Sequence, residues 1–526
     1  MGHIKNCNNY TFAPSFSPIN RIKMKYKYIL PFLVCLGLLP SLKAQNIQLD
    51  SLEPFIQKLM KDFEVTGLSL GIVTNNTILY AKGFGTRKIN QNLPVNANTL
   101  FGIGSISKSF TALTLGILVD EGKIHWDDKV KDYLPYFELQ DTYASENFTI
   151  RDLLTHRSGL REIAGGTLWY HSKLSRKEII KGLKYSEPVS GFREKPAYQN
   201  VMYLVAAEIV SEVTGMRWDA FLKQRVFDKI DMKTSTSVAS VRESNENLAF
   251  PHVWDANFKK TLVQQESGDN LAPAGFIYSS ANEMMNYMQL LLNDGIYKRD
   301  TLVSKKVIDE IFKPQILYPI EGSPFGNEFT SYGFGWWVTP RNNDKFIEHN
   351  GGIDGMAAKL FMLKDMNIGV IILTNISKEP ASYLLKAKLL EQLFNDTSLD
   401  FYDIVKGYRD RRVNRKPTTK KRVMDTSPSL PLDDFVGVYT DKMCGDIHVK
   451  MLDEKELEIS FSNSFIFKGK LTHWHFDTFQ IEWDDIRVPK GYVTFDFNSN
   501  QEITGMTVDQ QNLLDVDFRE LDIKKK

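Results

Sequence analysis

The chain has 526 residues, of which 42% are hydrophobic and 12% aromatic, and its 65 basic and 64 acidic side chains leave a formal charge of +1. A chain of this length and composition exceeds one compact domain, so we expect two folded domains. The balanced charge offers no basic surplus for nucleic acid, and no long apolar stretch follows the N-terminal one. Both a nucleic-acid-binding role and a multi-span membrane role are therefore set aside.

The N-terminus is typical of a signal peptide. Lysines precede an apolar stretch over residues 28–39, and a small-residue cleavage site ends at Ala44. We expect residues 1–44 to be a signal peptide, with a possible extra tail before Met24, and the protein to be exported, periplasmic or secreted. The alternative is an uncleaved anchor, although the apolar stretch is short for a spanning helix. Cleavage would leave Cys444 alone of the three cysteines, so no intrachain disulfide is expected.

A serine and a lysine three positions apart form the most informative pattern. Ser105 and Lys108 lie in the run FGIGSISKSF over residues 101–110, and residues three apart on a helix share one face. A serine hydroxyl needs a neighbouring base, and a lysine serves as one when burial lowers its pKa. The apolar residues from Phe110 to Val119 predict a buried helix with Ser105 at its N-terminus, where free N–H groups stabilise an oxyanion. Alone, such a match also arises by chance.

Two later motifs supply further polar residues in chain order. Tyr198 and Asn200 precede an apolar run, which places Tyr198 at a loop-to-helix junction facing a cleft. His349 precedes Gly351 and Gly352, and two β-type runs follow, so these glycines are expected on a strand against which a substrate backbone lies. Taken singly, the tyrosine is as typical of a core edge, and the histidine of an ordinary polar position.

Together these motifs resemble those of the class C β-lactamase and penicillin-recognising serine hydrolase family, which uses S-x-x-K, Y-x-N and a third motif of K-T-G or H-x-G type. Four further stretches are similar to that family: LVDEGK at 118–123, LLTHRSGL at 153–160, PAGFIYSSAN at 273–282 and YGFGWW at 332–337. The resemblance covers roughly residues 50–395. It implies an α/β fold of the β-lactamase/transpeptidase type, with a central antiparallel sheet flanked by helices, over residues 45–405.

The resemblance also implies roles for the motif residues. Ser105 would attack the carbonyl, Lys108 and Tyr198 would share general-base and general-acid duty, and His349 would tune the electrostatics of the site. A mainly helical region is expected before Tyr198. No metal or other cofactor is implied.

On the substrate side, the resemblance implies that Asn200 binds the substrate amide and that Gly351 and Gly352 belong to the substrate-binding strand. The N–H groups of Ser105 and Gly352 would form the oxyanion hole. The third motif departs from that of true β-lactamases, because the titratable His349 stands where a permanent lysine cation helps to bind the carboxylate of penicillins. Esters, D-amino-acid peptides or other amides are therefore favoured over β-lactams as substrates.

Two segments of the hydrolase region lack clear periodicity. Residues 165–195 and 235–270 are expected to form loops around the substrate cleft. A basic stretch follows the region, and we interpret residues 406–430 as a solvated linker.

Residues 431–526 change to an alternating pattern that predicts antiparallel strands, with runs at 447–451, 457–461, 493–497 and 514–518. These strands predict a small all-β barrel or sandwich. The segment also resembles the lipocalin-like C-terminal module of some hydrolases of this family, through FVGVY at 435–439 and HWHFDTF at 473–479. In such relatives the module sits over the active site or supports oligomers, so a homo-oligomer is possible.

No catalytic residue is expected in this second domain. His473 and His475 have no acidic or cysteine partner in a ligand pattern, so we expect them to pack in the barrel and not to bind a metal.

The favoured hypothesis is an exported serine hydrolase that cleaves an amide or ester of a small-molecule or peptide substrate through an acyl-enzyme on Ser105. The alternative is a penicillin-binding sensor or acyl-trapping protein without efficient turnover. A third possibility is a structural envelope protein with a decayed site. The filled positions Tyr198 and His349 argue against the last two.

Overall fold

The computed structural model describes residues 47–255, 258–319, 329–341, 344–413, 420–510, 513 and 515–526, leaving aside the side chains of residues 412 and 413. The expected signal peptide of residues 1–44 lies outside these residues. Within the described part of the chain, no helix is long and apolar enough to cross a membrane. A layered α/β domain comes first along the chain, and an all-β barrel follows it.

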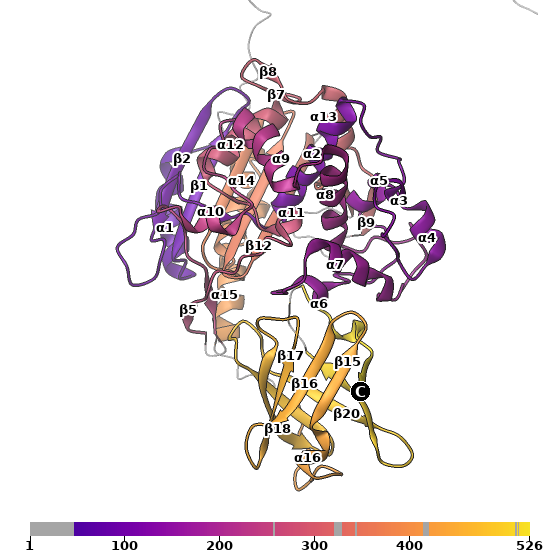
Figure 1. Cartoon of the computed structure of the whole chain (residues 1–526). Helices are drawn as coiled ribbons and strands as arrows, with labels where there is room; N and C mark the ends of the chain where they lie inside the picture. The colour runs from indigo at the N-terminus through magenta and orange to yellow at the C-terminus, as the bar shows by residue number, and fades with distance from the viewer. Residues whose placement is uncertain are drawn as a thin grey trace, which may run out of the picture. The chain divides into compact units, whose positions relative to one another are not determined.

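An eight-stranded antiparallel sheet forms the centre of the α/β domain, in the order β2-β1-β14-β13-β12-β11-β10-β9 (Figure 1). Its strands are β1 (Gly67–Val73), β2 (Ile78–Gly85), β9 (Ile316–Pro319), β10 (Phe329–Tyr332), β11 (Trp337–Arg341), β12 (Asp344–Ile353), β13 (Met356–Leu363) and β14 (Ile368–Thr374). The central strands β1 and β14 are buried along their whole length, because helices cover both faces of the sheet. The predicted fold class is confirmed.

The two faces of the sheet bury separate apolar clusters. On one face, α1 (Leu49–Asp62) and α14 (Ala381–Phe394) pack against alternate residues of β13 and β14, such as Phe361 and Val370. On the other face, α2 (Ser107–Asp120), α8 (Val201–Thr214) and α12 (Ala281–Leu292) pack against the intervening residues, such as Leu360 and Ile371. This alternation follows from the two-residue period of a strand.

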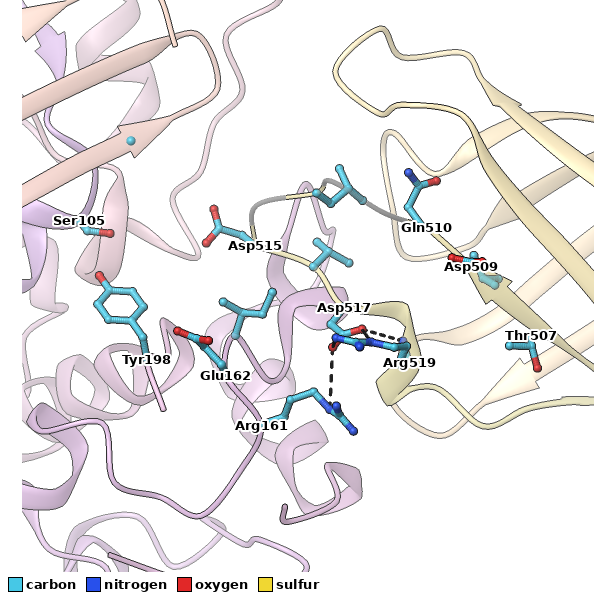
Figure 2. Close-up of a pocket in the computed structure, with 15 residues that line it drawn as sticks. Ser105, Arg161, Glu162, Tyr198, Thr507, Asp509, Gln510, Asp515, Asp517 and Arg519 are labelled. Carbon is cyan, nitrogen blue, oxygen red and sulfur yellow. Dashed lines mark hydrogen bonds and ion pairs between the residues drawn. The ribbon is translucent and has the colours of Figure 1, made fainter. Parts of the chain in front are cut away.

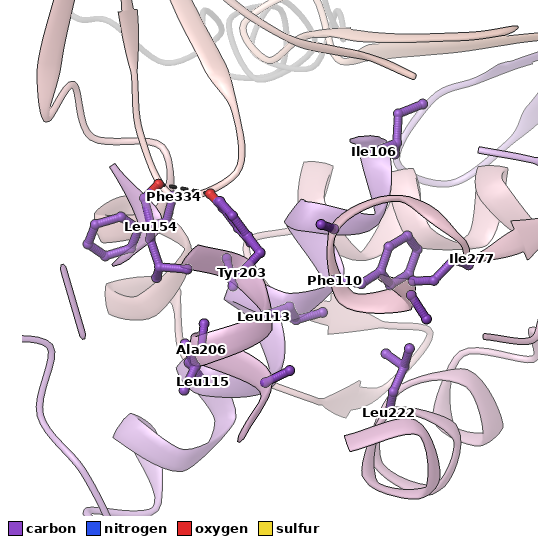
Figure 3. Packing of buried hydrophobic residues seen from close by; sticks show 14 of the residues in the cluster. Ile106, Phe110, Leu113, Leu115, Leu154, Tyr203, Ala206, Leu222, Ile277 and Phe334 are labelled. Carbon is purple, nitrogen blue, oxygen red and sulfur yellow. Dashed lines mark hydrogen bonds between the residues drawn. The ribbon is translucent and has the colours of Figure 1, made fainter. Parts of the chain in front are cut away.

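Helix α2 is buried on all sides. Figure 3 shows Phe110, Leu113 and Leu115 of this helix among residues of several other elements. The Phe110 ring stacks on Tyr287 of α12 with 3.9 Å between the ring centroids. A fully enclosed helix holds its first turn, which carries Lys108, rigidly in a dry environment, as the sequence predicts.

Short helices fill the region before Tyr198, as predicted: α3 (Val130–Tyr133), α4 (Thr142–Asn147), α5 (Ile150–Leu154), α6 (Gly166–Trp169) and α7 (Arg176–Gly182). The expected cleft loop over 165–195 is therefore wrong in part, since it contains α6 and α7. A capping box between Ser175 and Glu178 begins α7 and satisfies its first N–H groups. The second expected loop, 235–270, contains α10 (Ala239–Glu243) and a hairpin of β4 (His252–Trp254) and β5 (Lys260–Leu262).

The remaining short elements of this domain are β3 (Phe101–Gly102), which pairs with β6 (Tyr278–Ser279), and the hairpin of β7 (Ile296–Tyr297) and β8 (Asp300–Thr301). Its other helices are α9 (Trp218–Arg225), α11 (Ala272–Gly275), α13 (Lys305–Ile311) and α15 (Tyr402–Val413). Because α15 extends to Val413, the start of the expected linker is wrong. Arg409 of this helix donates hydrogen bonds to the Asp62 carbonyl and to Glu64, so it is not a solvated connector residue.

The second part of the chain is a closed antiparallel barrel of eight strands in sequence order. After α16 (Leu432–Phe435) its strands are β15 (Gly437–Asp441), β16 (Gly445–Met451), β17 (Glu456–Phe461), β18 (Lys468–His475), β19 (Thr478–Trp483), β20 (Gly491–Phe497), β21 (Ile503–Asp509) and β22 (Ile523–Lys525). Aromatic side chains fill its interior, and Phe435 packs edge-on against Phe479 and Phe495. The predicted all-β barrel is confirmed, and its likeness to lipocalins stays a prediction.

One predicted strand of the barrel is wrong. Of residues 514–518, the described ones form no strand, and a 3₁₀ turn spans Phe518–Glu520. A β-bulge between His473 and His475 also interrupts the regular alternation of β18.

Candidate active site

Ser105 lies on a tight turn between strand β3 and helix α2. The turn is a 3₁₀ helix over Gly104–Ile106 that leads directly into α2, so Ser105 precedes the α-helix that carries Lys108. Gly104 has a φ of 55°, and a Cβ there would collide with the backbone nitrogen of Gly352. Only glycine allows this close approach of the turn to β12. Ser105 thereby lines a cavity, directly before the buried helix at whose N-terminus the sequence predicts it.

Lys108 is fully buried and its ammonium nitrogen has three partners. Nζ lies 3.0 Å from Ser105 Oγ, 2.6 Å from Asn200 Oδ1 and 2.8 Å from the carbonyl oxygen of Ala274. Burial lowers the pKa of Lys108 from 10.5 to about 7, against an opposing effect of the Asp515 charge. As a neutral amine, Lys108 would donate its two N–H groups to Asn200 and Ala274 and turn its lone pair to Ser105. The lysine is thus placed and poised as a base.

Tyr198 and Asn200 lie at the loop that leads into α8, as the sequence predicts. Figure 2 shows the Tyr198 hydroxyl pointing toward Ser105. Burial raises the pKa of Tyr198 well above 10, while a hydrogen bond with Ser105 opposes the rise. The Lys108 ammonium lies 4.8 Å from the centre of the Tyr198 ring. Tyr198 is therefore a neutral phenol within reach of the serine hydroxyl.

The His156 ring packs against the Tyr198 ring. The two ring centres lie 4.3 Å apart, and His156 Nδ1 accepts a hydrogen bond from the Gln199 backbone N–H. Burial and the Lys108 charge hold the pKa of His156 well below 6.5, so the ring is neutral. His156 has a φ of 56°, a left-handed conformation that surrounding contacts must enforce.

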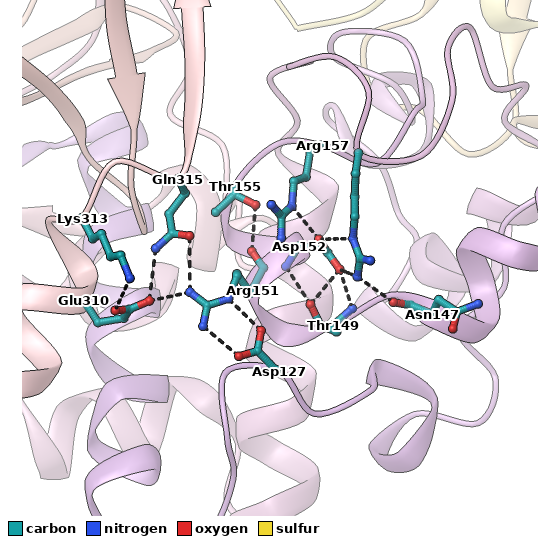
Figure 4. A network of polar contacts seen from close by, with 11 residues as sticks. Asp127, Asn147, Thr149, Arg151, Asp152, Thr155, Arg157, Glu310, Lys313 and Gln315 are labelled. Atoms are coloured by element: carbon teal, nitrogen blue, oxygen red, sulfur yellow. Dashed lines mark hydrogen bonds and ion pairs between the residues drawn. The ribbon is translucent and has the colours of Figure 1, made fainter. Parts of the chain in front are cut away.

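A buried ion-pair network provides that enforcement (Figure 4). Asp152 is fully buried in the first turn of α5, where it forms a capping box with Thr149. Arg157 and Arg193 bind its carboxylate at 2.6 Å and 2.7 Å. This network holds the chain on both sides of His156, which lies in the LLTHRSGL stretch recognised from the sequence without a role.

His349 lies on β12 and is buried with both ring nitrogens occupied. Nδ1 donates to the Asn350 carbonyl at 2.7 Å, so Nε2 accepts from the Tyr332 hydroxyl at 3.0 Å. Burial and the Lys108 charge lower the pKa of His349 to about 3. The expectation of a titratable imidazole is therefore wrong, because His349 stays neutral throughout the physiological range.

Gly351 and Gly352 have different surroundings on the same strand. A Cβ on Gly351 would collide with the carbonyl oxygen of Ile103. This glycine therefore lets β12 pack against the turn that carries Ser105. Gly352 is exposed, has open space where a Cβ would be, and lines the cavity with Ser105. Of the two, Gly352 is the one that faces the cavity.

The cavity at Ser105 has a volume of about 1080 Å³ and is lined by both domains (Figure 2). Ser105, Tyr198 and Gly352 lie on its hydrolase side, and residues 507–510, 513, 515–517 and 519 line its barrel side. A smaller lobe of about 140 Å³, lined by aromatic residues that include Trp169 and Tyr170, also contains Ser105. Among the described residues no group of three or more His, Cys, Asp or Glu side chains could hold a metal ion.

Asp515 is the residue that sequence reasoning missed. It follows β21 and belongs to the barrel part of the chain, yet it lines both lobes of the cavity. Its Oδ1 accepts a hydrogen bond of 3.1 Å from Asn200 Nδ2. That no catalytic residue lies in the second domain stays a prediction, but the barrel does contribute residues to the lining of the cavity. The alternating Asp515, Val516, Asp517 and Phe518 looked like a strand because the acids face the hydrolase domain while Val516 and Phe518 enter the barrel core.

Comparisons with known protein families match two family models to successive parts of the chain. A family model described as Beta-lactamase matches residues 52–393. A second model, described as a domain of unknown function (DUF3471), matches residues 421–525, which include the barrel.

Individual relatives are distant. The chain is 22% identical to the unguisins hydrolase ungD of Aspergillus violaceofuscus, over 73% of each chain. It is 28% identical to penicillin-binding protein 4* of Bacillus subtilis, over 59% of this chain and 68% of the relative. A solved structure of the octameric penicillin-binding protein homologue from Pyrococcus abyssi is 22% identical and superimposes with a TM-score of 0.60, covering 91% of this chain and 100% of that one. That likeness shows a shared fold.

Proposed function

Since the chain belongs to the beta-lactamase family and is a serine hydrolase, we propose that it cleaves amide or ester bonds through an acyl-enzyme formed on Ser105. The observation that carries this proposal is the Lys108 amine, which lies 3.0 Å from Ser105 Oγ in a dry environment that lowers the lysine pKa to about 7. A base with a pKa near the working pH is the most effective proton acceptor for a serine nucleophile.

In the proposed reaction, Ser105 Oγ attacks the substrate carbonyl carbon while its proton passes to the neutral Lys108 amine. The carbonyl oxygen becomes an oxyanion, which the N–H groups of Ser105 and Gly352 stabilise. Collapse of the intermediate breaks the bond to the leaving group, which takes a proton from the Tyr198 hydroxyl, and Lys108 returns a proton to Tyr198. Water then attacks the acyl-enzyme by the same proton path and releases Ser105.

The charges around the cavity favour substrates without a carboxylate at the third motif. His349 is neutral there, so it offers no cation to the carboxylate of a penicillin. Asp515 and the exposed Glu162 line the same cavity and would repel such a group, whereas the two arginines of the lining, Arg161 and Arg519, are both paired with Asp517. We therefore expect esters and simple amides to react faster than penicillins.

Intact-mass analysis tests the nucleophile. The purified protein, Ser105→Ala and the neighbouring Ser109→Ala as control would be incubated with p-nitrophenyl acetate, D-alanine amide, penicillin G and an alkyl fluorophosphonate. We expect an adduct or product with the wild type and Ser109→Ala, and none with Ser105→Ala. Equal product from Ser105→Ala would overturn the assignment. A single equivalent of product without a steady state would favour the acyl-trapping alternative.

We also propose that the protein is exported, on the basis of the apolar stretch over residues 28–39 and its cleavage site at Ala44. The mature chain would begin at Gln45. N-terminal sequencing of the protein from the periplasmic or secreted fraction tests this, and an intact N-terminus in the cell interior would contradict it. Self-association through the barrel is a further proposal, and light scattering of the purified protein measures it.

A further inference from the structure

Three hydrogen bonds connect the barrel to the nucleophile. Asp515 accepts from Asn200 Nδ2 at 3.1 Å, Asn200 Oδ1 accepts from Lys108 Nζ at 2.6 Å, and Lys108 Nζ lies 3.0 Å from Ser105 Oγ. Figure 2 shows Asp515 on the barrel side of the same cavity that Ser105 and Tyr198 face. Asn200 is therefore held between a group of each domain.

This arrangement decides which way the Asn200 amide points. A carboxylate only accepts hydrogen bonds, so Asp515 selects the amide nitrogen and turns the amide oxygen to Lys108. With Asn200 Oδ1 and the Ala274 carbonyl taking the two N–H groups of a neutral Lys108, its lone pair has Ser105 as the remaining partner. The reversed amide would offer Lys108 a donor and compete for that lone pair. One Asn200 N–H is left over for a substrate carbonyl.

The position of Asp515 is itself fixed by the hydrolase domain. Glu520, five residues further on, accepts hydrogen bonds from the backbone N–H of Gly165 at 2.9 Å and from the hydroxyl of Thr167 at 2.8 Å. Gly166 lies directly beneath the backbone, because a Cβ there would collide with the Asp515 carbonyl oxygen. The segment from Asp515 to Glu520 thus rests on the N-terminus of α6.

The charge of Asp515 also acts on Lys108, because it opposes the lowering of the lysine pKa by burial. The groups around Lys108 include Tyr198, Tyr203, His156 and His349, and burial keeps all four neutral by raising the pKa of the tyrosines and lowering that of the histidines. Near Asp515, the neutral Tyr170 donates to Asp354, which also pairs with His171 and Arg487. Among the residues that the structure describes, the direct hydrogen-bond partner of Asp515 is the Asn200 amide, and no cationic side chain hydrogen-bonds to it.

We infer that Asp515 is a positioning residue of the hydrolase reaction, supplied by the barrel: it orients Asn200 so that Lys108 presents its lone pair to Ser105. The inference rests on the proposed function, because it assigns Lys108 as the base of Ser105. It gives the barrel a direct part in the chemistry of the site.

The test measures how fast an alkyl fluorophosphonate labels Ser105 between pH 5.5 and 9.5, by intact mass. Asp515→Asn keeps an oxygen acceptor for Asn200 but removes the charge, so the acid limb of the profile should move to lower pH by about one unit. Asp515→Ala removes the acceptor as well, so its plateau rate should also fall, by about tenfold or more. Asp496→Asn removes an exposed charge of β20 on the same barrel and should match the wild type.

A further variant, at Gly166, moves the Asp515 carboxylate without removing it. Gly166→Ala pushes the backbone of Asp515 away from α6, so its plateau rate should fall as in Asp515→Ala, with circular dichroism establishing that each variant is folded. The inference would be overturned if Asp515→Asn, Asp515→Ala and Gly166→Ala all kept the wild-type acid limb and the wild-type plateau rate. The proposed function would still stand in that case. A wild-type protein that is neither labelled on Ser105 nor active on any substrate would overturn both.

Discussion

Replacement of Lys108 by methionine should change how the stability of the protein depends on pH. The lysine has a folded-state pKa of about 7 because it is buried, against an ordinary value of 10.5. Between these two values the unfolded chain binds more protons than the folded one, so wild-type stability rises with pH in this window. At about 1.4 kcal/mol for each pH unit, the gain between pH 6 and pH 9 is about 3 kcal/mol.

Lys108→Met lacks this gain. Asp515 adds to this difference between wild type and variant. Its pKa is already raised by burial, and it rises further in the variant because the lysine charge is gone. A carboxyl whose pKa is raised in the folded state makes the protein less stable as pH increases, so the variant loses stability where the wild type gains it. Urea unfolding of both proteins at pH 6 and pH 9, followed by near-UV circular dichroism, gives the four free energies. We expect the wild type to gain about 3 kcal/mol more than the variant between the two pH values.

The reasoning would be refuted if the free energies of unfolding of the two proteins changed in parallel with pH. If the wild type and Lys108→Met gain or lose the same free energy of unfolding between pH 6 and pH 9, then Lys108 does not titrate in this window. The lysine would then be a permanent cation and could not act as the base at neutral pH. Comparing differences between pH values cancels the cost of leaving the Asn200 and Ala274 acceptors unpaired in the variant.

Three further predictions concern other residues of the site and the domain contact. His349→Gln should leave the acid limb of Ser105 labelling in place, because His349 is already neutral above about pH 5 with its pKa near 3, and a shifted limb would show that the histidine titrates. Burial raises the pKa of Glu520 to about 7, so wild-type stability should fall as pH rises from 4.5 through 7, by at most about 3 kcal/mol, and Glu520→Gln should flatten this fall in urea titrations. Gly351→Ala should cost about 1–3 kcal/mol in thermal unfolding and slow Ser105 labelling, because its Cβ would push the Ile103 carbonyl and the nucleophile turn; an unchanged midpoint would contradict the packing described.

The catalytic side of the site could be predicted from the sequence because its residues stand in short motifs with local geometry. Ser105 and Lys108 are three positions apart at the start of a helix whose all-round apolar character already implies burial. Tyr198 and Asn200 precede a second buried helix, and strand β12 carries His349 next to glycines. The helix or strand that holds each motif can therefore be predicted from the residues next to it. The tertiary fold then brings the three motifs together.

Asp515 and Glu520 could not be predicted in the same way, because their partners are remote and on the other domain. Alternating acidic and apolar residues satisfy the pattern of a half-buried strand equally well when an irregular segment is packed between two domains. The neutral state of His349 was missed for a related reason. A histidine motif indicates a titratable group, and only the surrounding burial decides whether that group takes up a proton.

Asn200 and Asp515 are separated by 315 residues along the chain, although their side chains are hydrogen-bonded. At 5–20 residues per second, a ribosome needs roughly 15–60 s to synthesise the intervening chain. For that time the growing chain contains Ser105, Lys108 and Asn200 but not yet the carboxylate that accepts the hydrogen bond from Asn200. On the inference that Asp515 orients Asn200, the serine becomes fully reactive only after the barrel has been made, and a chain interrupted during synthesis would carry an incompletely activated Ser105.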